Sequence, residues 1–372
     1  MVKDKRLLLF PLLAVVLGLL ALINYNDGAL IEDTGLSSRT YKVGFRSFEL
    51  TYINDNGISE QLSTAIWYPT SSVPKEYTYD NGEVSVIALD GTAAQQDNPY
   101  PLVIFNHGLG ADELDPIYLK EYLASEGYIV ISCDYSDNLW GTITNLFDPS
   151  LEQYGIDSDV TGLSDVAANL LRSYYIAFFD DYRFGQTTFM IDEAIRMNHD
   201  SDSFLFGKID ETAIGMSGHS LGGLNTLGLI GSHPNSNVKD DRIKAALLLA
   251  SPIYPFDTTI DKVSVPLMLM VGEYDVLATQ PEGSWWCLCD LLSTPNYYLV
   301  LEEAHHFTFS QAACDNYRTV GQCQDDNQQV NTILDYALAF FDYYLKGNNE
   351  ALGKITSGDD DMLTAYEWAN VP

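Results

Sequence analysis

The residue most suited to chemistry in this sequence is a serine between two glycines. Ser220 lies in the stretch GHSLGG at 218–223, directly after an apolar run. We expect a strand over 211–218 and a helix after it, so that the serine falls on a sharp turn that lifts its hydroxyl clear of the sheet. Gly218 and Gly222 leave room for that turn, and the free N–H groups of the helix point to where negative charge develops. The pattern predicts a nucleophile.

A serine hydroxyl reacts slowly unless a base lies beside it. When the serine follows a strand in this way, the acid and then the histidine come later in the chain, after later strands. Of the six histidines, only His305 and His306 follow the last apolar strand, predicted at 297–304. Either histidine is a candidate base.

The acid that orients the histidine is expected at the end of the preceding strand. Asp275 closes the run PLMLMVGEYD at 266–275, and Glu273 lies two residues earlier at the same strand end. We assign the role to Asp275 and keep Glu273 as the alternative.

A tetrahedral oxyanion needs two backbone donors. We assign one to the N–H of Leu221, directly after the serine. The other belongs to the glycine-rich loop after the strand predicted at 101–108, and we assign it to Leu109, with Gly110 as the alternative. His107 in this loop is expected to brace it rather than to react.

Short apolar segments alternate with helical ones from residue 101 onward, which predicts an α/β fold with a mostly parallel sheet covered by helices on both faces. The expected strands are residues 41–53, 62–69, 101–108, 128–135, 211–218, 244–252, 266–275 and 297–304. Helices are expected at 116–127 and 328–346. Residues 70–99 are rich in turn-forming residues, so we expect a long surface excursion there.

The N-terminal segment is predicted to direct export. Residues 1–28 place three basic residues before an unbroken apolar run at 7–23. This layout is typical of a signal peptide or an N-terminal membrane anchor, and both readings place the remainder outside the cytoplasm. Residues 7–23 are therefore the expected site of any membrane association, and the polar residues 29–40 read as a tether.

We expect one catalytic domain over residues 41–350. Within it, residues 136–182 contain several aromatics but no core strand, and they read as an insertion that is either a lid or a peripheral packing element. Residues 351–372 read as an acidic C-terminal tail, and the acidic run at 358–361 lacks the spaced ligands of a calcium loop. The sequence predicts neither a metal site nor a cofactor.

The charge and the cysteines limit the partners and the compartment. The net charge of −33 disfavours nucleic acid, because phosphate would be repelled over most of the surface. Export permits disulfides. Cys314 and Cys323 flank a short loop and could pair with each other, or either could pair with Cys287 or Cys289. Cys133, inside an apolar strand, is expected to be a buried free thiol.

Four motifs in order give the chain a family resemblance: HGLGA at 107–111, GHSLGG at 218–223, VGEYD at 271–275 and AHHF at 304–307. It resembles the α/β-hydrolase superfamily over residues 41–348. The branch it resembles most is that of dienelactone hydrolases and platelet-activating-factor acetylhydrolases, and residues 207–346 are also similar to bacterial cutinase-type polyester hydrolases. The resemblance favours His306 over His305, because related hydrolases end this loop in Ala-x-His-Phe.

The chain departs from two members of that branch. Animal acetylhydrolases place the acid after the preceding strand, where this chain offers only Asp257, so Asp275 is preferred. Dienelactone hydrolases have a cysteine nucleophile, whereas this chain has a serine. Dienelactone itself is therefore not expected as the substrate.

The resemblance and the residues together predict an exported serine carboxylesterase. The expected substrates are small-molecule or lipid esters, above all short-acyl lipid or phospholipid esters. The alternatives are a polyester hydrolase, a peptidase or thioesterase, and a binding protein without activity. An intact set of catalytic residues argues against the last of these.

Overall fold

The computed structural model describes residues 39–54, 56–135, 183–256, 259–275, 278, 291–358 and 360–371. All of them fall within one of the two units of the chain, Asp33–Pro372, and the other unit is Met1–Glu32. The predicted signal or anchor at 1–28, most of the tether and the predicted insertion at 136–182 lie outside the described residues. Among the residues that are described, no helix is long and apolar enough to cross a membrane.

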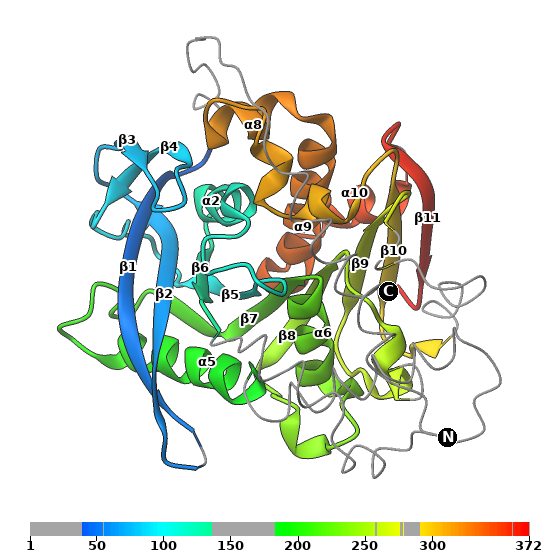
Figure 1. Ribbon diagram of the computed structural model, residues 1–372, viewed down its shortest axis with the longest axis horizontal. Coiled ribbons are helices and arrows are strands. Elements are labelled where there is room, and N and C mark those ends of the chain that lie inside the picture. The colour runs from blue at the N-terminus through cyan, green and yellow to red at the C-terminus, as the bar shows by residue number, and fades with distance from the viewer. Residues whose placement is uncertain are drawn as a thin grey trace, which may run out of the picture. The chain divides into compact units, whose positions relative to one another are not determined.

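The described part is built on one sheet of eleven strands, in the order β11-β10-β9-β8-β7-β5-β6-β2-β1-β4-β3 (Figure 1). The strands are β1 Lys42–Ile53, β2 Ser59–Thr70, β3 Lys75–Thr78, β4 Val84–Leu89, β5 Tyr100–Asn106, β6 Ile129–Cys133, β7 Ile209–His219, β8 Ile243–Leu249, β9 Leu267–Gly272, β10 Asn296–Leu301 and β11 Leu363–Ala369. The six strands from β5 to β10 run parallel to one another, whereas β2 and β11, which flank them, are antiparallel to β6 and β10. The predicted mostly parallel sheet is confirmed.

The central strands are apolar on both faces because helices cover both sides of the sheet. Every residue of β5 and β6 is buried, as is every residue of β9. Figure 1 shows α2, Ile117–Ser125, α8, Val320–Asp326, and α9, Gln328–Lys346, on one face. On the other face lie α5, Phe184–His199, and α6, Leu221–Leu227.

The last long helix occupies the residues predicted for it, 328–346, because both of its ends carry strong local signals. The Asn327 side chain accepts hydrogen bonds from the N–H groups of Gln329 and Val330 at the start. Gly347 ends the helix in the left-handed conformation, with φ 66°. The apolar side of α9 then packs against β7 and β8.

Two segments contain more regular structure than the sequence predicted. Residues 70–99, expected as a surface excursion, contain β3 and β4, and β4 pairs in parallel with β1. Residues 351–372, expected as an acidic tail, contain α10, Ala351–Ser357, and the edge strand β11, which pairs with β10. The prediction of a tail was wrong because it relied on the acidic run and gave no weight to the strand-forming stretch LTAYEWA that follows.

One of the expected disulfides is present in the described part of the chain. Cys314 and Cys323 form a disulfide that joins the short helix η10, Gln311–Cys314, to α8. Cys133 on β6 is a buried free thiol, as predicted. Cys287 and Cys289 lie outside the described residues.

Candidate active site

Ser220 stands on a strained turn between β7 and α6. Its φ and ψ are 53° and −117°, a conformation that a residue with a side chain rarely adopts. A Cβ at residue 218 would collide with the Gly222 backbone, and one at residue 222 would collide with the Asn106 carbonyl. The predicted need for both glycines is confirmed.

The hydroxyl at the turn lies within hydrogen-bond distance of one histidine. His306 Nε2 is 2.9 Å from Ser220 Oγ. The other ring nitrogen, Nδ1, is 3.1 and 3.0 Å from the two carboxylate oxygens of Asp275. Three side chains from the ends of β7, β9 and β10 thus form a continuous chain of hydrogen bonds, which we call the Ser220–His306–Asp275 cluster.

Burial favours a fixed geometry in this cluster. Asp275 is 1% exposed and His306 is 8% exposed. The N–H of Ala278 donates to Asp275 Oδ1 at 2.9 Å, which holds the carboxylate toward the imidazole. With the carboxylate accepting from Nδ1–H, Nε2 is the nitrogen left to accept the serine proton.

The turn that follows β10 separates the two neighbouring histidines. His306 begins the short helix η9, His306–Phe309, and its side chain is buried. His305 precedes that helix, is exposed, and lies beside the Tyr274 ring in a tilted arrangement, with 5.4 Å between ring centroids. Thr308 Oγ1 accepts from the His305 N–H at 3.0 Å and fixes this turn. Of the two candidates, His306 is therefore the one that the structure brings to Ser220.

The alternative acid, Glu273, lies apart from the imidazole. It is exposed, and its carboxylate accepts from the Glu303 N–H at 2.9 Å. Its role in the described structure is to join the loops after β9 and β10. Asp257, the acid of the animal acetylhydrolase arrangement, lies outside the described residues.

The loop after β5 runs beside the serine. A Cβ at Gly108 would stand 3.5 Å from Ser220 Cβ, so the Gly108 backbone borders the nucleophile. Leu109 follows it and is 41% exposed, and Gly110 has φ 75°. Leu221 opens α6, where the first N–H groups have no partner within the helix. Leu221 and the Gly108 backbone, to which Leu109 is joined, thus both adjoin Ser220.

His107 braces this loop in a single tautomer. The Tyr135 N–H donates to His107 Nε2 at 3.0 Å, so Nδ1 carries the proton and donates to the Gly108 carbonyl at 2.7 Å. Burial, together with the nearby Arg183 cation, holds the pKa of His107 well below its usual value. The ring is neutral, so its contact with the Asp134 carboxylate at 3.6 Å does not count as an ion pair.

His219, the residue before the serine, contacts the backbone of the turn that carries His306. Its Nε2–H donates to the His306 carbonyl at 3.1 Å, and the two rings lie 4.9 Å apart between centroids. Burial, and then the proximity of His306, lowers the pKa of His219 to about 3. His219 therefore adds no second positive charge when the neighbouring imidazole becomes protonated.

The comparisons with known proteins divide the chain into two parts. A family model described as platelet-activating factor acetylhydrolase, isoform II, matches residues 52–161. A second, described as PET hydrolase-like, matches residues 177–323, which include Ser220, Asp275 and His306. Both families consist of ester hydrolases with the α/β-hydrolase fold. No curated protein matches the chain.

The chain has the α/β-hydrolase fold and is an ester hydrolase. The expected resemblance to acetylhydrolases and polyester hydrolases is confirmed. The first match contains the motif HGLGA, and the second contains GHSLGG, VGEYD and AHHF. The strand order of the esterase agrees with the fold. From β5 the chain moves to β6 on one side, and it then crosses to β7 on the other side of β5. Ser220 lies at this switch in direction, where ligands bind in open α/β sheets.

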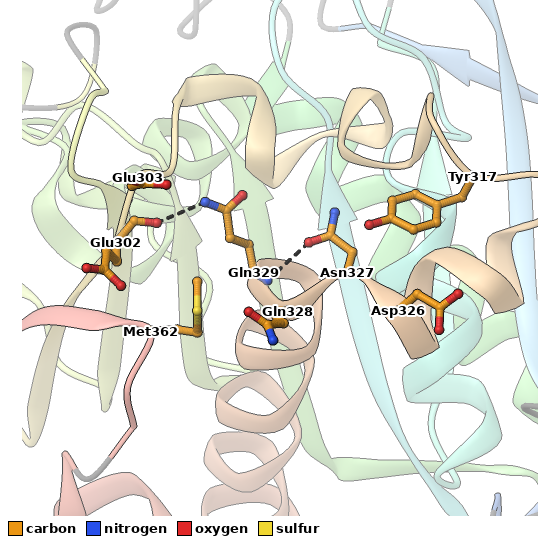
Figure 2. A pocket seen from close by; sticks show the side chains of 8 residues that line it. All are labelled: Glu302, Glu303, Tyr317, Asp326, Asn327, Gln328, Gln329 and Met362. Atoms are coloured by element: carbon orange, nitrogen blue, oxygen red, sulfur yellow. Dashed lines mark hydrogen bonds between the residues drawn. The ribbon is translucent and has the colours of Figure 1, made fainter. Parts of the chain in front are cut away.

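A hollow of about 320 Å³ in the described part of the esterase is lined by none of Ser220, His306 and Asp275 (Figure 2). Its walls are mostly polar and come from the loop after β10, the loop before α8, the end of α8 with the start of α9, and the residue before β11. The lining residues are Glu302, Glu303, Tyr317, Asp326, Asn327, Gln328, Gln329 and Met362. Figure 2 shows the Gln329 side chain reaching the Glu302 carbonyl, a hydrogen bond of 2.9 Å. Among the described residues, no three His, Cys, Asp or Glu side chains stand close enough together to hold a metal ion.

Proposed function

We propose that the chain is an exported serine esterase in which Ser220, His306 and Asp275 form the catalytic triad. The observation that carries the proposal is the chain of hydrogen bonds from Ser220 Oγ to His306 Nε2 at 2.9 Å and from His306 Nδ1 to Asp275 at 3.0 Å. These contacts have the geometry that a general base and its orienting acid require.

In the proposed reaction, Ser220 Oγ attacks the ester carbonyl while its proton passes to His306 Nε2. The N–H groups of Leu109 and Leu221 donate to the resulting oxyanion, and Asp275 stabilises the imidazolium. The tetrahedral intermediate then collapses, and His306 returns the proton to the departing alkoxide, which leaves as the alcohol. Water, deprotonated by His306, attacks the acyl-serine and releases the acid and the free serine.

We infer that the substrate presents an apolar group at the mouth of the site. Leu109, Tyr274 and Phe307 are 41%, 50% and 41% exposed, and each is adjacent in sequence to a residue of the proposed machinery or belongs to it. Apolar side chains left in water beside a reactive group favour an apolar ligand. Short-acyl lipid or phospholipid esters fit this lining, and the match to the acetylhydrolase model supports them.

A polyester is the second candidate substrate, because the PET hydrolase-like model covers the triad residues. Two assays separate the candidates. The first measures kcat/KM for esters of increasing acyl length, with and without a phospholipid head group. The second measures the release of soluble acid from a polyester film. A preference for short acyl chains on a phospholipid supports the first candidate.

The disulfide between Cys314 and Cys323 supports export, because such bonds persist in oxidising compartments. We propose that the catalytic domain lies outside the cytoplasm, with residues 7–23 either cleaved or retained as an anchor. Fractionation of cells that express the full chain, followed by N-terminal sequencing, separates these two forms. Recovery of the reduced protein in the cytoplasm contradicts export.

The triad is tested by Ser220→Ala. Loss of the nucleophile is expected to lower kcat for p-nitrophenyl acetate by about 10⁴–10⁶-fold, because the three residues act as a unit. His306→Ala is expected to lower kcat similarly, and His305→Ala, which changes the exposed neighbour, is the matched control and is expected to retain activity. Unchanged hydrolysis by the Ser220 variant contradicts the proposal.

A further inference from the structure

We propose that Arg183 is a positioning residue that aims the Leu109 N–H at the oxyanion, an inference that rests on the proposed esterase mechanism. Arg183 directly precedes α5, and its side chain is fully buried, 0% exposed. It lies 76 residues along the chain from the loop that it contacts. A buried arginine needs a specific set of acceptors, because its charge is removed from water.

The guanidinium binds two backbone carbonyls in the loop after β5, residues 107–110, which we call the oxyanion loop. One terminal nitrogen donates to the His107 carbonyl at 2.7 Å, and the other lies 3.4 Å from the Gly108 carbonyl. The Gly108 carbonyl also accepts from His107 Nδ1 at 2.7 Å. Two side chains, one of them cationic, and the Ala111 N–H at 3.3 Å therefore hold the oxygen of the same peptide group.

That peptide group is the one whose N–H belongs to Leu109. In a planar trans peptide, the carbonyl and the N–H point in opposite directions. Because the Gly108 oxygen is held toward Arg183 and His107, the Leu109 N–H points the other way. The Gly108 backbone borders Ser220, so the orientation of this peptide decides whether the donor is available beside the nucleophile.

The charge of Arg183 adds to the fixed geometry. A cation at the carbonyl end of a peptide polarises it, which strengthens the N–H as a donor at the other end. The guanidinium also lies over the Tyr135 ring, with its Cζ 4.8 Å from the ring centroid, and Tyr135 supplies the N–H that fixes the His107 tautomer. Arg183, Tyr135 and His107 thus act on the loop together.

The first turn of α5 connects Arg183 to the rest of the site. Thr187 Oγ1 donates to the Arg183 carbonyl at 2.8 Å and accepts from the Asn225 side chain of α6 at 2.8 Å. Asn106, at the end of β5, donates through its side-chain amide to Thr226 of α6 at 2.9 Å. The oxyanion loop, the serine helix and the start of α5 are therefore joined by buried polar contacts.

The test compares Arg183→Lys and Arg183→Met with the wild type. Lysine keeps the charge but loses the planar two-nitrogen fork, and methionine keeps only the apolar length. Arg196→Met is the matched control, since Arg196 lies on the same helix but is 55% exposed and forms its ion pairs with the neighbouring acids Glu193 and Asp200. For each variant, kcat and KM are measured with p-nitrophenyl butyrate, and rates are divided by the sites that a fluorophosphonate titrates to completion.

A second readout isolates the oxyanion. A trifluoromethyl ketone forms a tetrahedral adduct with the serine, and its oxygen occupies the position of the transition-state oxyanion. We expect Arg183→Met to lower kcat by about 10–100-fold with KM within about twofold, and to weaken the ketone by a similar factor. Arg183→Lys is expected to fall between this variant and the wild type, and Arg196→Met to match the wild type.

Each outcome decides the proposal. A folded Arg183→Met with wild-type kcat and ketone affinity overturns it, as does a rise in KM with kcat unchanged, which would assign Arg183 to substrate binding. If the methionine variant does not fold, the lysine variant decides: wild-type values for both readouts overturn the proposal. Failure of the proposed esterase mechanism is distinguishable from failure of the Arg183 proposal, because it appears as activity that survives Ser220→Ala.

Discussion

At Ser220, backbone strain and close packing are both required to expose one hydroxyl. The residue has φ 53°, which costs of order 1–3 kcal/mol for a side chain other than glycine. The Ser220 N–H donates to the Leu249 carbonyl at 2.8 Å, and the Leu224 N–H donates to the Ser220 carbonyl at 3.2 Å. Neighbouring strand and helix thus hold the strained backbone in place on both sides.

Gly222→Ala is expected to lower both stability and activity. The added Cβ would collide with the Asn106 carbonyl, so α6 must move away from β5. Overpacking of this kind typically costs 1–3 kcal/mol and occasionally more, so we expect a loss of about 3 kcal/mol in urea unfolding and at least a tenfold loss of kcat. Gly353→Ala, in α10 with open space around it, is the control and is expected to be neutral or slightly stabilising. A Gly222 variant with wild-type stability contradicts the close approach.

The residues of the site differ in how far the sequence could reveal them. Ser220 carries a local signal, because the turn needs glycines at fixed positions. The choice between His305 and His306 depends on the turn that buries one ring and exposes the other, which single residues do not encode. Arg183 could not be recognised, because it binds backbone carbonyls, which leave no trace in the sequence of the loop.

At the scale of elements, a buried carboxyl joins α2 to the strands at the far edge of the sheet. Glu121 of α2 accepts hydrogen bonds of 2.7 Å from Tyr79, which follows β3, and from Ser85 of β4. Tyr79 in turn accepts from the Trp67 indole at 2.9 Å. Burial, only partly offset by the two hydroxyl donors, raises the pKa of Glu121 from 4.5 to about 7.

This carboxyl should make stability depend on pH. Between pH 4.5 and 7 the folded state keeps a proton that the unfolded state has released, so stability falls as pH rises through that window. The two pKa values correspond to on the order of 3 kcal/mol. Glu121→Gln removes the titration, so its stability relative to the wild type should rise by about that amount from pH 4.5 to 8.

Urea unfolding at several pH values measures this difference, and the fixed cost of changing the hydrogen bonds cancels when the pH values are compared. Glu76→Gln, on the exposed side of β3, removes the same charge from the surface and serves as the control. A stability difference between the Glu121 variant and the wild type that stays constant with pH contradicts a raised pKa.

The same edge of the sheet shows where prediction from sequence fails. The core strands β5 to β10 and the helix α9 were predicted, because unbroken apolar runs and clear caps mark them. The strands β3 and β4 were missed because each is short and lies among turn-forming residues, and the pairing of β4 with β1 is non-local. Helix α5 was not recognised either, since it has polar residues such as Gln186 and Thr187 on its buried side.

Across the whole molecule, acidic residues exceed basic ones by a wide margin. The 52 Asp and Glu residues against 19 Lys and Arg residues give a net charge of −33. Such an excess destabilises a folded chain through self-repulsion, and dissolved ions screen that repulsion. The measured stability of this esterase should therefore depend on ionic strength.

We expect the melting temperature to rise by a few degrees when NaCl is increased from about 0.05 to about 0.5 M, because the Debye length falls from above 10 Å to below it. Equal shifts in NaCl and KCl distinguish general screening from the binding of one cation. A melting temperature that stays flat or falls over this range contradicts the role of self-repulsion.

The central claim is that Ser220 forms a covalent bond with the acyl group while His306 removes its proton. The most direct measurement is reaction of the whole protein with a fluorophosphonate, followed by mass spectrometry of its peptides. We predict one adduct, on Ser220, that forms at least about a hundredfold more slowly in His306→Ala, because the hydroxyl then lacks its base. An adduct on another residue, or ester hydrolysis that continues with Ser220 unmodified, would contradict the claim.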